Sequence, residues 1–182
     1  MSGNSMKVIG LAGWSGSGKT TLIVQLIPAL VRRGLRVSTM KHAHHAFDVD
    51  KPGKDSYEHR AAGATEVMIG SGKRWALMHE LRGAPEPALG DLIAALSPCD
   101  LVLVEGFKRE AIPKIEVHRA GASDGGLLFP HDTHVVAIAS DAMLTTHLPL
   151  FGLEDFDRIG DFVEARAACV AAPLRLVRAQ SG

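Results

Sequence analysis

A glycine-rich segment near the N-terminus constrains the fold more than any other part of the sequence. Residues 13–20 read Gly-Trp-Ser-Gly-Ser-Gly-Lys-Thr and match the phosphate-binding pattern GxxxxGK[ST] at every fixed position. The apolar run 8–12 before it predicts a buried strand. The amphipathic stretch 20–33 after it predicts a helix, bent or interrupted at Pro28. A strand before the loop and a helix after it form the context that phosphate binding requires.

The residue types in this segment have specific roles in holding a nucleotide. Glycines let the backbone wrap around a phosphate with its N–H groups pointing inward, and a helix N-terminus adds partial positive charge. Lys19 is expected to reach the β- and γ-phosphates, and the Thr20 hydroxyl to reach Mg²⁺. The segment is therefore interpreted as a P-loop. The residues expected to contact the nucleotide here are Gly13, Ser15, Gly16, Ser17, Gly18, Lys19, Thr20 and Thr21.

Apolar runs alternate with amphipathic stretches along the rest of the chain, which predicts an α/β fold with a mostly parallel sheet flanked by helices. Further strands are predicted at 35–40, 101–104, 112–118 and 135–139, and further helices at 89–96 and 154–172. Asp55 and Glu58 resemble a capping box for a short helix that ends near Gly63. Residues 66–69 and 74–79 flank Gly-Ser-Gly-Lys and predict a β-hairpin.

Length and composition limit the classes of protein to consider. The 182 residues predict one P-loop domain over 6–172, with 1–5 an added remnant or disordered and 173–182 a C-terminal tail. Lys and Arg number 20 and Asp and Glu number 20, so no net field attracts nucleic acid or an anionic membrane. No apolar run approaches the ~18 residues that span a bilayer. Two cysteines without a CxxC spacing indicate a reducing, cytoplasmic setting.

A second acidic group is expected at the end of the 101–104 strand. Residues 100–106 read Asp-Leu-Val-Leu-Val-Glu-Gly, the Walker B pattern of an apolar strand that ends in a carboxylate. Glu105 is expected to hold Mg²⁺ together with Thr20, and the alternative is a solvated glutamate. The N–H of Gly106 is expected near a γ-phosphate, and Lys108, followed by Arg109, faces either an anionic ligand or water.

Two further segments are candidates for the nucleotide site. Residues 41–50 contain His42, His44, His45 and two aspartates, which suits a transition-metal site, a loop that senses the nucleotide, or a solvated loop. In the same region Asp50 is expected near the Mg²⁺ water shell and Lys54 near a phosphate. Asp141 ends the 135–139 strand where P-loop GTPases place a guanine-reading aspartate. The usual Asn-Lys is missing, so the choice between guanine and adenine stays open.

Several segments together resemble one family, the molybdopterin-guanine dinucleotide biosynthesis protein B (MobB) family. They are the P-loop with Thr21, Lys41-His42-x-His44-His45, residues 48–56, residues 74–78 and residues 104–108. The resemblance extends from residue 6 to about residue 170. Residues 41–56 are its specific part, because the P-loop alone indicates only an NTPase.

The resemblance implies a GTP-binding P-loop protein, usually a homodimer, that works beside the enzyme attaching GMP to molybdopterin. Family members are thought to assist that step and not to perform it, and their GTP hydrolysis is weak. By position, residues 16–21 would hold phosphates, Thr20 and Glu105 would serve Mg²⁺, and the loop from Asp50 to Ser56 would complete the site. The hairpin at 74–79 would contribute to subunit contact.

Two other functions remain open from the residues alone. A small-molecule kinase would share the P-loop and bring arginines such as Arg82, Arg109 and Arg119 over the transferred group. A metal-insertion GTPase would use His42, His44 and His45. No water-positioning glutamine or arginine finger is identifiable, which is consistent with weak GTP hydrolysis at most and leaves the catalytic residues unknown.

Overall fold

The computed structural model describes residues 6–43, 47–122 and 125–170, and these residues form two compact units. The larger unit belongs to the ranges Met1–His42 and Asp91–Gly182, and the smaller unit to Ala43–Gly90. Residues 1–5 and the tail 173–182 lie outside the described residues. The single domain over 6–172 stays a prediction, and each unit is described by itself below.

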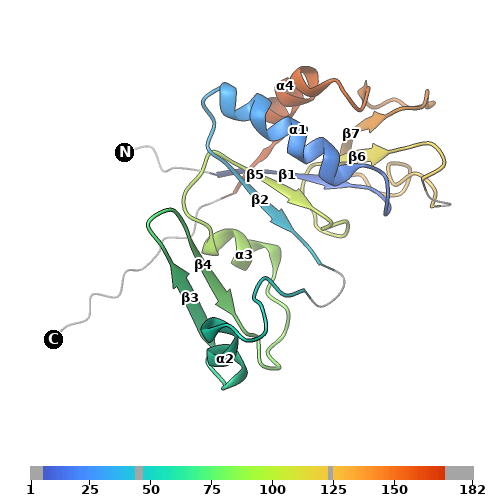
Figure 1. Cartoon of the computed structure of the whole chain (residues 1–182). Helices are drawn as coiled ribbons and strands as arrows, with labels where there is room; N and C mark the ends of the chain where they lie inside the picture. Colours follow the sequence, from blue (N-terminus) through green and yellow to red (C-terminus); the bar gives the residue numbers. More distant parts are fainter. Residues whose placement is uncertain (1–5, 44–46, 123–124, 171–182) are drawn as a thin grey trace. The chain divides into compact units, whose positions relative to one another are not determined.

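The larger unit is built on a mostly parallel sheet, which confirms the predicted fold class (Figure 1). Its strands lie in the order β2-β5-β1-β6-β7-β8, and β9 pairs with β1. Their bounds are β1 Met6–Ala12, β2 Val37–Lys41, β5 Leu101–Glu105, β6 Lys114–His118, β7 Val135–Ser140, β8 Leu150–Phe151 and β9 Ala168–Val170. Every pairing among the first six is parallel.

One face of this sheet packs against two helices, α1 (Lys19–Arg32) and α4 (Phe156–Arg166), which contact each other (Figure 1). Side chains of α1 at helical spacing enter the core beside alternate residues of β1, β5 and β6. Pro28 lies inside α1 without ending it. The helix ends where Gly34, at a φ of +85°, donates its N–H to the Val31 carbonyl.

The opposite face of the sheet contains charged side chains on β6. Lys114 and Glu116 are each 1% exposed. The stem of Lys114 crosses β1 at Gly10, where an added Cβ would lie 2.8 Å from Lys114 Cγ. Gly10 therefore leaves room for a buried lysine, which explains a glycine in the middle of a buried strand.

The C-terminal part of this unit differs from the prediction. The helix expected over 154–172 ends at Arg166, and β9 follows it, antiparallel to the start of β1. The reason is that β6 pairs only with Gly10–Ala12, so residues Met6–Val8 have backbone groups available for another strand. Residues 171–172 of the expected helix lie outside the described residues.

The smaller unit contains α2 (Asp55–Ala61) and an antiparallel hairpin of β3 (Glu66–Gly70) and β4 (Trp75–His79), which confirms the predicted hairpin. The helix α3 (Leu89–Ala95) begins at the end of this unit. The prediction of a capping box is wrong, because Lys54 is the N-cap of α2 and its side chain makes no capping hydrogen bond. Asp55 and Glu58 lie instead in the first helical turn, where their negative charges interact favourably with the positive end of the helix dipole.

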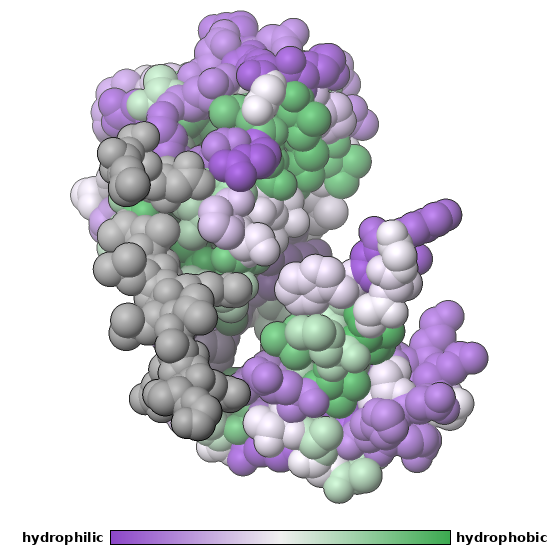
Figure 2. Space-filling model, turned by 90° about the vertical axis from the view of Figure 1, so that its left-hand side faces the viewer, coloured by the Kyte–Doolittle hydropathy of each residue, from purple (hydrophilic) through white to green (hydrophobic). Residues whose placement is uncertain are grey.

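The hairpin presents hydrophobic side chains to solvent. Met68 and Trp75 are 65% and 62% exposed, and Leu77 is 44% exposed. Met68 and Leu77 are cross-strand partners, and Trp75 lies two residues before Leu77, so all three share one face of the hairpin. Hydrophobic residues also appear at the surface in the lower part of Figure 2, where the hairpin lies.

We predict that Gly10→Ala destabilises the protein, because the new Cβ would overlap the buried side chain of Lys114. The expected loss in the free energy of unfolding is about 1–3 kcal/mol, typical of overpacking in a buried region. Urea denaturation followed by circular dichroism measures it. Gly70→Ala is the matched control, since Gly70 also lies in a strand and nothing lies within 4 Å of its added Cβ. Equal losses in the two variants would contradict this explanation of Gly10.

Candidate functional site

The carboxyl ends of the parallel strands gather most of the predicted site residues. The P-loop follows β1, Glu105 ends β5, and Asp141 follows β7. Because β2, β5, β1, β6 and β7 are parallel neighbours, these positions lie along one edge of the sheet. Ligand crevices in α/β proteins form at this edge.

The P-loop depends on glycine at three positions. Gly13, Gly16 and Gly18 have φ values of +147°, +78° and +93°, which side chains rarely adopt. At Gly13 space is also lacking, because an added Cβ would lie 2.3 Å from the Val117 carbonyl oxygen. Ser15 in the loop is exposed, as are Thr20 and Thr21 in the first turn of α1.

The N-terminus of α1 is open to an anion. Gly18 caps it in the left-handed conformation without a side-chain hydrogen bond, and the first turn contains no acidic residue. The N–H groups of that turn and the helix dipole therefore favour negative charge at this position. Ser17 is buried beside it, and its Oγ has no hydrogen-bond partner among the described residues. A phosphate oxygen would satisfy such donors.

Lys19 is held over the loop. Its Nζ donates to the Trp14 carbonyl oxygen at 2.8 Å. Burial lowers the pKa of Lys19, an effect that the nearby Glu105 carboxylate opposes and that the charges of Lys108 and Lys41 reinforce. An incoming phosphate would stabilise the charged ammonium, so this lysine is suited to bind an anion.

The two residues predicted to hold a metal are in contact. The Thr20 hydroxyl donates to Glu105 Oε1 at 2.9 Å. Lys41 Nζ lies 3.5 Å from the same oxygen. The sequence reasoning did not assign Lys41 to the site. The signal that could have found it is the register of β2 with β5, in which Lys41 and Glu105 are partners.

Gly106 and Lys108 lie on the loop after Glu105. Gly106 has a φ of +93°, and an added Cβ would lie 3.2 Å from the His42 carbonyl oxygen. Lys108 places its Nζ 4.1 Å from the centre of a Trp14 ring, within cation–π distance. Lys108 therefore lies beside the P-loop, and its contact with a nucleotide stays a prediction.

Arg119 and Asp141 lie on the other side of the P-loop. The Arg119 guanidinium is 3.5 Å from where a Cβ of Gly18 would stand, so it lies against the start of α1. Asp141 Oδ1 accepts the Ala120 N–H at 2.8 Å and holds the loop that follows β6. This contact gives Asp141 a structural role, and its contact with a base stays a prediction.

Two predicted residues belong to the smaller unit, which is not placed relative to the P-loop. Asp50 Oδ1 accepts the Ser56 hydroxyl at 2.9 Å, so Asp50 links its loop to α2. Lys54 is the N-cap of α2. The roles predicted for both at the nucleotide stay predictions.

The histidine segment is only partly described. His42 follows β2 and packs against the Phe107 ring, with centroids 5.1 Å apart. His44 and His45 lie outside the described residues. Within the described ranges, no three His, Cys, Asp or Glu side chains cluster as metal ligands would.

Comparison with known proteins identifies close similarity to one family. The sequence profile described as "MobB: Molybdopterin guanine dinucleotide synthesis protein B" matches residues 8–141. A relative from Escherichia coli K12, named molybdopterin-guanine dinucleotide biosynthesis adapter protein, is 47% identical over 166 residues, covering 90% of this chain and 95% of its own. A Haemophilus influenzae protein of the same name is 42% identical and covers 88% of this chain and 89% of its own.

Solved structures agree with this result. The chain resembles a crystal structure of molybdopterin-guanine biosynthesis protein B with a TM-score of 0.69 and 27% identity, covering 87% of this chain and 98% of that one. It resembles a MobB homologue from Bacillus stearothermophilus with a TM-score of 0.65 and 27% identity, covering 88% and 97%. These structures support the P-loop α/β fold.

We predict that Lys19→Ala abolishes nucleotide binding while the fold is retained. A charge-assisted contact to phosphate contributes roughly 3 kcal/mol, so the dissociation constant for a nucleoside triphosphate should rise at least ~100-fold. Calorimetric titration measures binding, and circular dichroism checks the fold. Lys73→Ala, in the exposed turn between β3 and β4, is the control. Wild-type affinity in Lys19→Ala would show that the site is assigned to the wrong residues.

Proposed function

The chain belongs to the family of molybdopterin guanine dinucleotide synthesis protein B, and we propose that it is a GTP-binding accessory protein that assists the guanylylation of molybdopterin. The nucleotide part of the proposal rests on the contact of Thr20 with Glu105, which lies beside a helix start that has no side-chain cap. The accessory role rests on the adapter relatives, whose names describe biosynthesis of molybdopterin-guanine dinucleotide.

Magnesium fits the donor set at this site. A threonine hydroxyl and a glutamate carboxylate are hard oxygen ligands, and Mg²⁺ is commonly held by one or two such groups together with nucleotide phosphates. Mg²⁺ would offset phosphate charge. Lys19 and the N–H groups at the start of α1 would position the phosphates, and Lys41 and Lys108 would add positive charge at the same edge.

Hydrolysis of GTP is proposed to be weak. Among the described residues the only glutamine is Gln25, and it lies within α1 after the phosphate-binding turn. A glutamine that orients water is the usual device of fast GTPases. The nucleotidyl transfer itself is proposed to belong to a partner, the molybdenum cofactor guanylyltransferase, with molybdopterin as the shared ligand and the cytoplasm as the compartment.

The other two functions receive less support. A kinase would bring several arginines over the phosphates. Arg119 lies against the start of α1, but Arg82 donates to the carbonyl oxygens of Arg60 and Ala64 within the smaller unit, and the relatives are named adapter proteins. A metal-insertion protein would differ from the biosynthetic adapters that the chain resembles.

The proposed function predicts that the protein stimulates a molybdenum cofactor guanylyltransferase. Formation of molybdopterin guanine dinucleotide should rise several-fold when the wild-type protein and GTP·Mg²⁺ are added, and Lys19→Ala should give no stimulation.

A binding panel of GTP, ATP and GDP, with and without Mg²⁺, should favour GTP. Glu105→Gln should reduce the gain in affinity that Mg²⁺ brings, because an amide is a weaker ligand than a carboxylate.

Two results would contradict the proposal. If Lys19→Ala stimulated the guanylyltransferase as much as the wild type does, the accessory role would not depend on nucleotide binding. Equal affinity for GTP and ATP would remove the assignment of the guanine nucleotide.

We further propose that the chain forms a homodimer through the exposed face of the β3–β4 hairpin. Val67 is buried on the face that lies toward α2, whereas Met68, Trp75 and Leu77 form a hydrophobic patch on the other face. A two-stranded sheet is marginally stable alone, and an exposed patch of large hydrophobic side chains marks an interaction surface. A second copy presents the same patch and can cover it by twofold symmetry.

The dimer is tested with Trp75→Ser and Leu77→Ser. Each should shift the protein from dimer to monomer in sedimentation velocity at micromolar concentrations, since each removes apolar contact area. Met143→Ser is the matched control, because Met143 is an even more exposed hydrophobic residue in the larger unit. A monomeric wild type, or dimers that persist in both hairpin variants, would refute this interface.

A further inference from the structure

We propose that the larger unit contains a second ligand site beside the P-loop, and that it takes a flat heteroaromatic ring carrying a phosphate, the chemistry of a phosphorylated pterin. This inference rests on the proposed function, because the adapter role brings such a ligand to the protein. The site is a cavity of about 590 Å³, within the range of small-molecule pockets.

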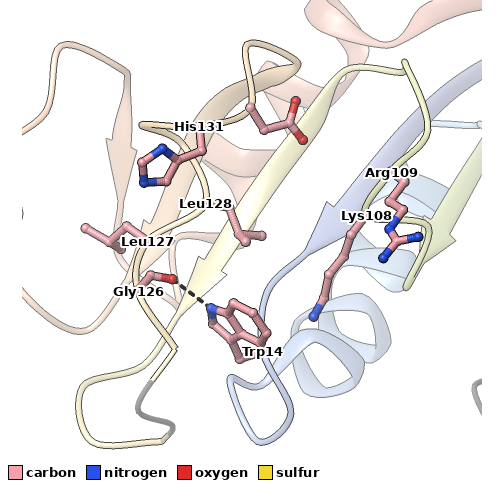
Figure 3. A pocket seen from close by; sticks show the side chains of 8 residues that line it. Trp14, Lys108, Arg109, Gly126, Leu127, Leu128 and His131 are labelled. Carbon is pink, nitrogen blue, oxygen red and sulfur yellow. Dashed lines mark hydrogen bonds between the residues drawn. The ribbon is translucent and has the colours of Figure 1, made fainter.

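Three chain segments form the walls of the cavity (Figure 3). The P-loop contributes the indole of Trp14. The loop after β5 contributes Lys108 and Arg109, and the loop between β6 and β7 contributes Leu127, Leu128 and His131. All three belong to the larger unit, so the cavity does not depend on the placement of the smaller one.

Two buried charges on β6 hold these loops in place. Lys114 donates to the carbonyl oxygens of Lys108 and Glu110 at 2.7 and 2.8 Å, and to the Asp132 carboxylate at 2.6 Å. These partners occupy all three of its N–H donors. Lys108 and Asp132 belong to two different loops that line the cavity. The ammonium of Lys114 therefore links these two loops.

Glu116, two residues further along β6, holds the second wall. Its two carboxylate oxygens accept the N–H groups of Leu128 and Phe129 at 2.7 and 2.9 Å. Burying a charge costs several kcal/mol unless hydrogen bonds compensate for the loss of water. Lys114 and Glu116 therefore hold parts of both loops that line the cavity.

The lining suits a ring and an anion together. Trp14, Leu127 and Leu128 supply aromatic and apolar surface for a flat ring. Lys108 and Arg109 supply positive charge at the same cavity.

The one acidic side chain of the lining does not oppose an anion. Burial acts to raise the pKa of Asp132, but hydrogen bonds from Lys114 and from the His134 backbone lower it below its usual value. Asp132 is thus ionised, and its negative charge is offset by the ammonium of Lys114. The positive charges of Lys108 and Arg109 then favour a phosphate in the cavity.

Trp14 joins this cavity to the P-loop. Its carbonyl oxygen accepts the Lys19 ammonium, whereas its indole N–H donates to the Gly126 carbonyl at 2.7 Å (Figure 3). The indole also packs against Gly125, where an added Cβ would lie 2.3 Å from the ring. A ligand in the cavity would therefore lie next to the nucleotide without occupying the phosphate-binding loop.

The test uses neopterin monophosphate as the probe and the full chain loaded with a non-hydrolysable GTP analogue and Mg²⁺. Calorimetric titration should give one site per chain. Arg109→Glu should weaken binding of the probe at least tenfold by reversing the charge, and Leu127→Asp should do so by making the apolar wall polar. Both should bind the GTP analogue within twofold of wild type. Unphosphorylated neopterin should bind at least tenfold more weakly than the phosphate.

Arg32→Glu is the matched control for charge reversal. Arg32 is exposed in the last turn of α1, about 20 Å along the helix from the P-loop. This variant should bind the probe within twofold of wild type.

Three outcomes would overturn the second site. They are no saturable binding of the probe, displacement of the bound GTP analogue by the probe, and wild-type affinity in both Arg109→Glu and Leu127→Asp. A chain that binds the GTP analogue and stimulates the guanylyltransferase but fails this test would keep its proposed function and lose only the second site. Failure to bind GTP at all would instead refute the proposed function.

Discussion

The parallel pairing of β1 with β5 is the interaction on which the site in the larger unit depends. Leu11 pairs with Glu105, so the P-loop leaves β1 next to the carboxylate that ends β5. The Thr20 hydroxyl can then reach Glu105 across the edge of the sheet. Both strands are buried on both faces, and their register is therefore fixed by the core and not by the loops. The register of these two strands thus sets the geometry that favours a nucleotide.

The sequence predicted this part of the fold well because each signal there is local. The P-loop pattern, the apolar run ending in Glu105 and the helical periodicity of α1 can each be recognised within about fifteen residues. Two features needed information from distant segments. Lys41 joins the site only through the register of β2 with β5, and β9 forms because the start of β1 lacks a partner on one side. Neither fact is present in the local pattern of residues 37–41 or 168–170.

The buried charges of β6 show a second limit of reading the sequence by pattern. Residues 112–118 predict a strand, and the structure contains one over Lys114–His118. The pattern does not reveal that Lys114 and Glu116 are buried and that their partners are backbone groups of two loops. Gly10 is unusual in a buried strand, but the sequence pattern does not give the reason, because that reason is the side chain of a lysine 104 residues away that crosses β1. A polar residue within a strand is usually assigned to a solvated face, and here that assumption fails.

The two faces of the sheet therefore have different physical tasks. The face covered by α1 and α4 is apolar and supplies the stability that fixes the strand register. The opposite face uses charge to hold loops, which is costly unless every donor and acceptor is satisfied. Because Trp14 belongs to the P-loop and also packs on the loops held by Lys114 and Glu116, the two faces meet at the site. A change in the P-loop on binding a nucleotide would act on Trp14 directly, because the phosphate site and the cavity beside it share this residue.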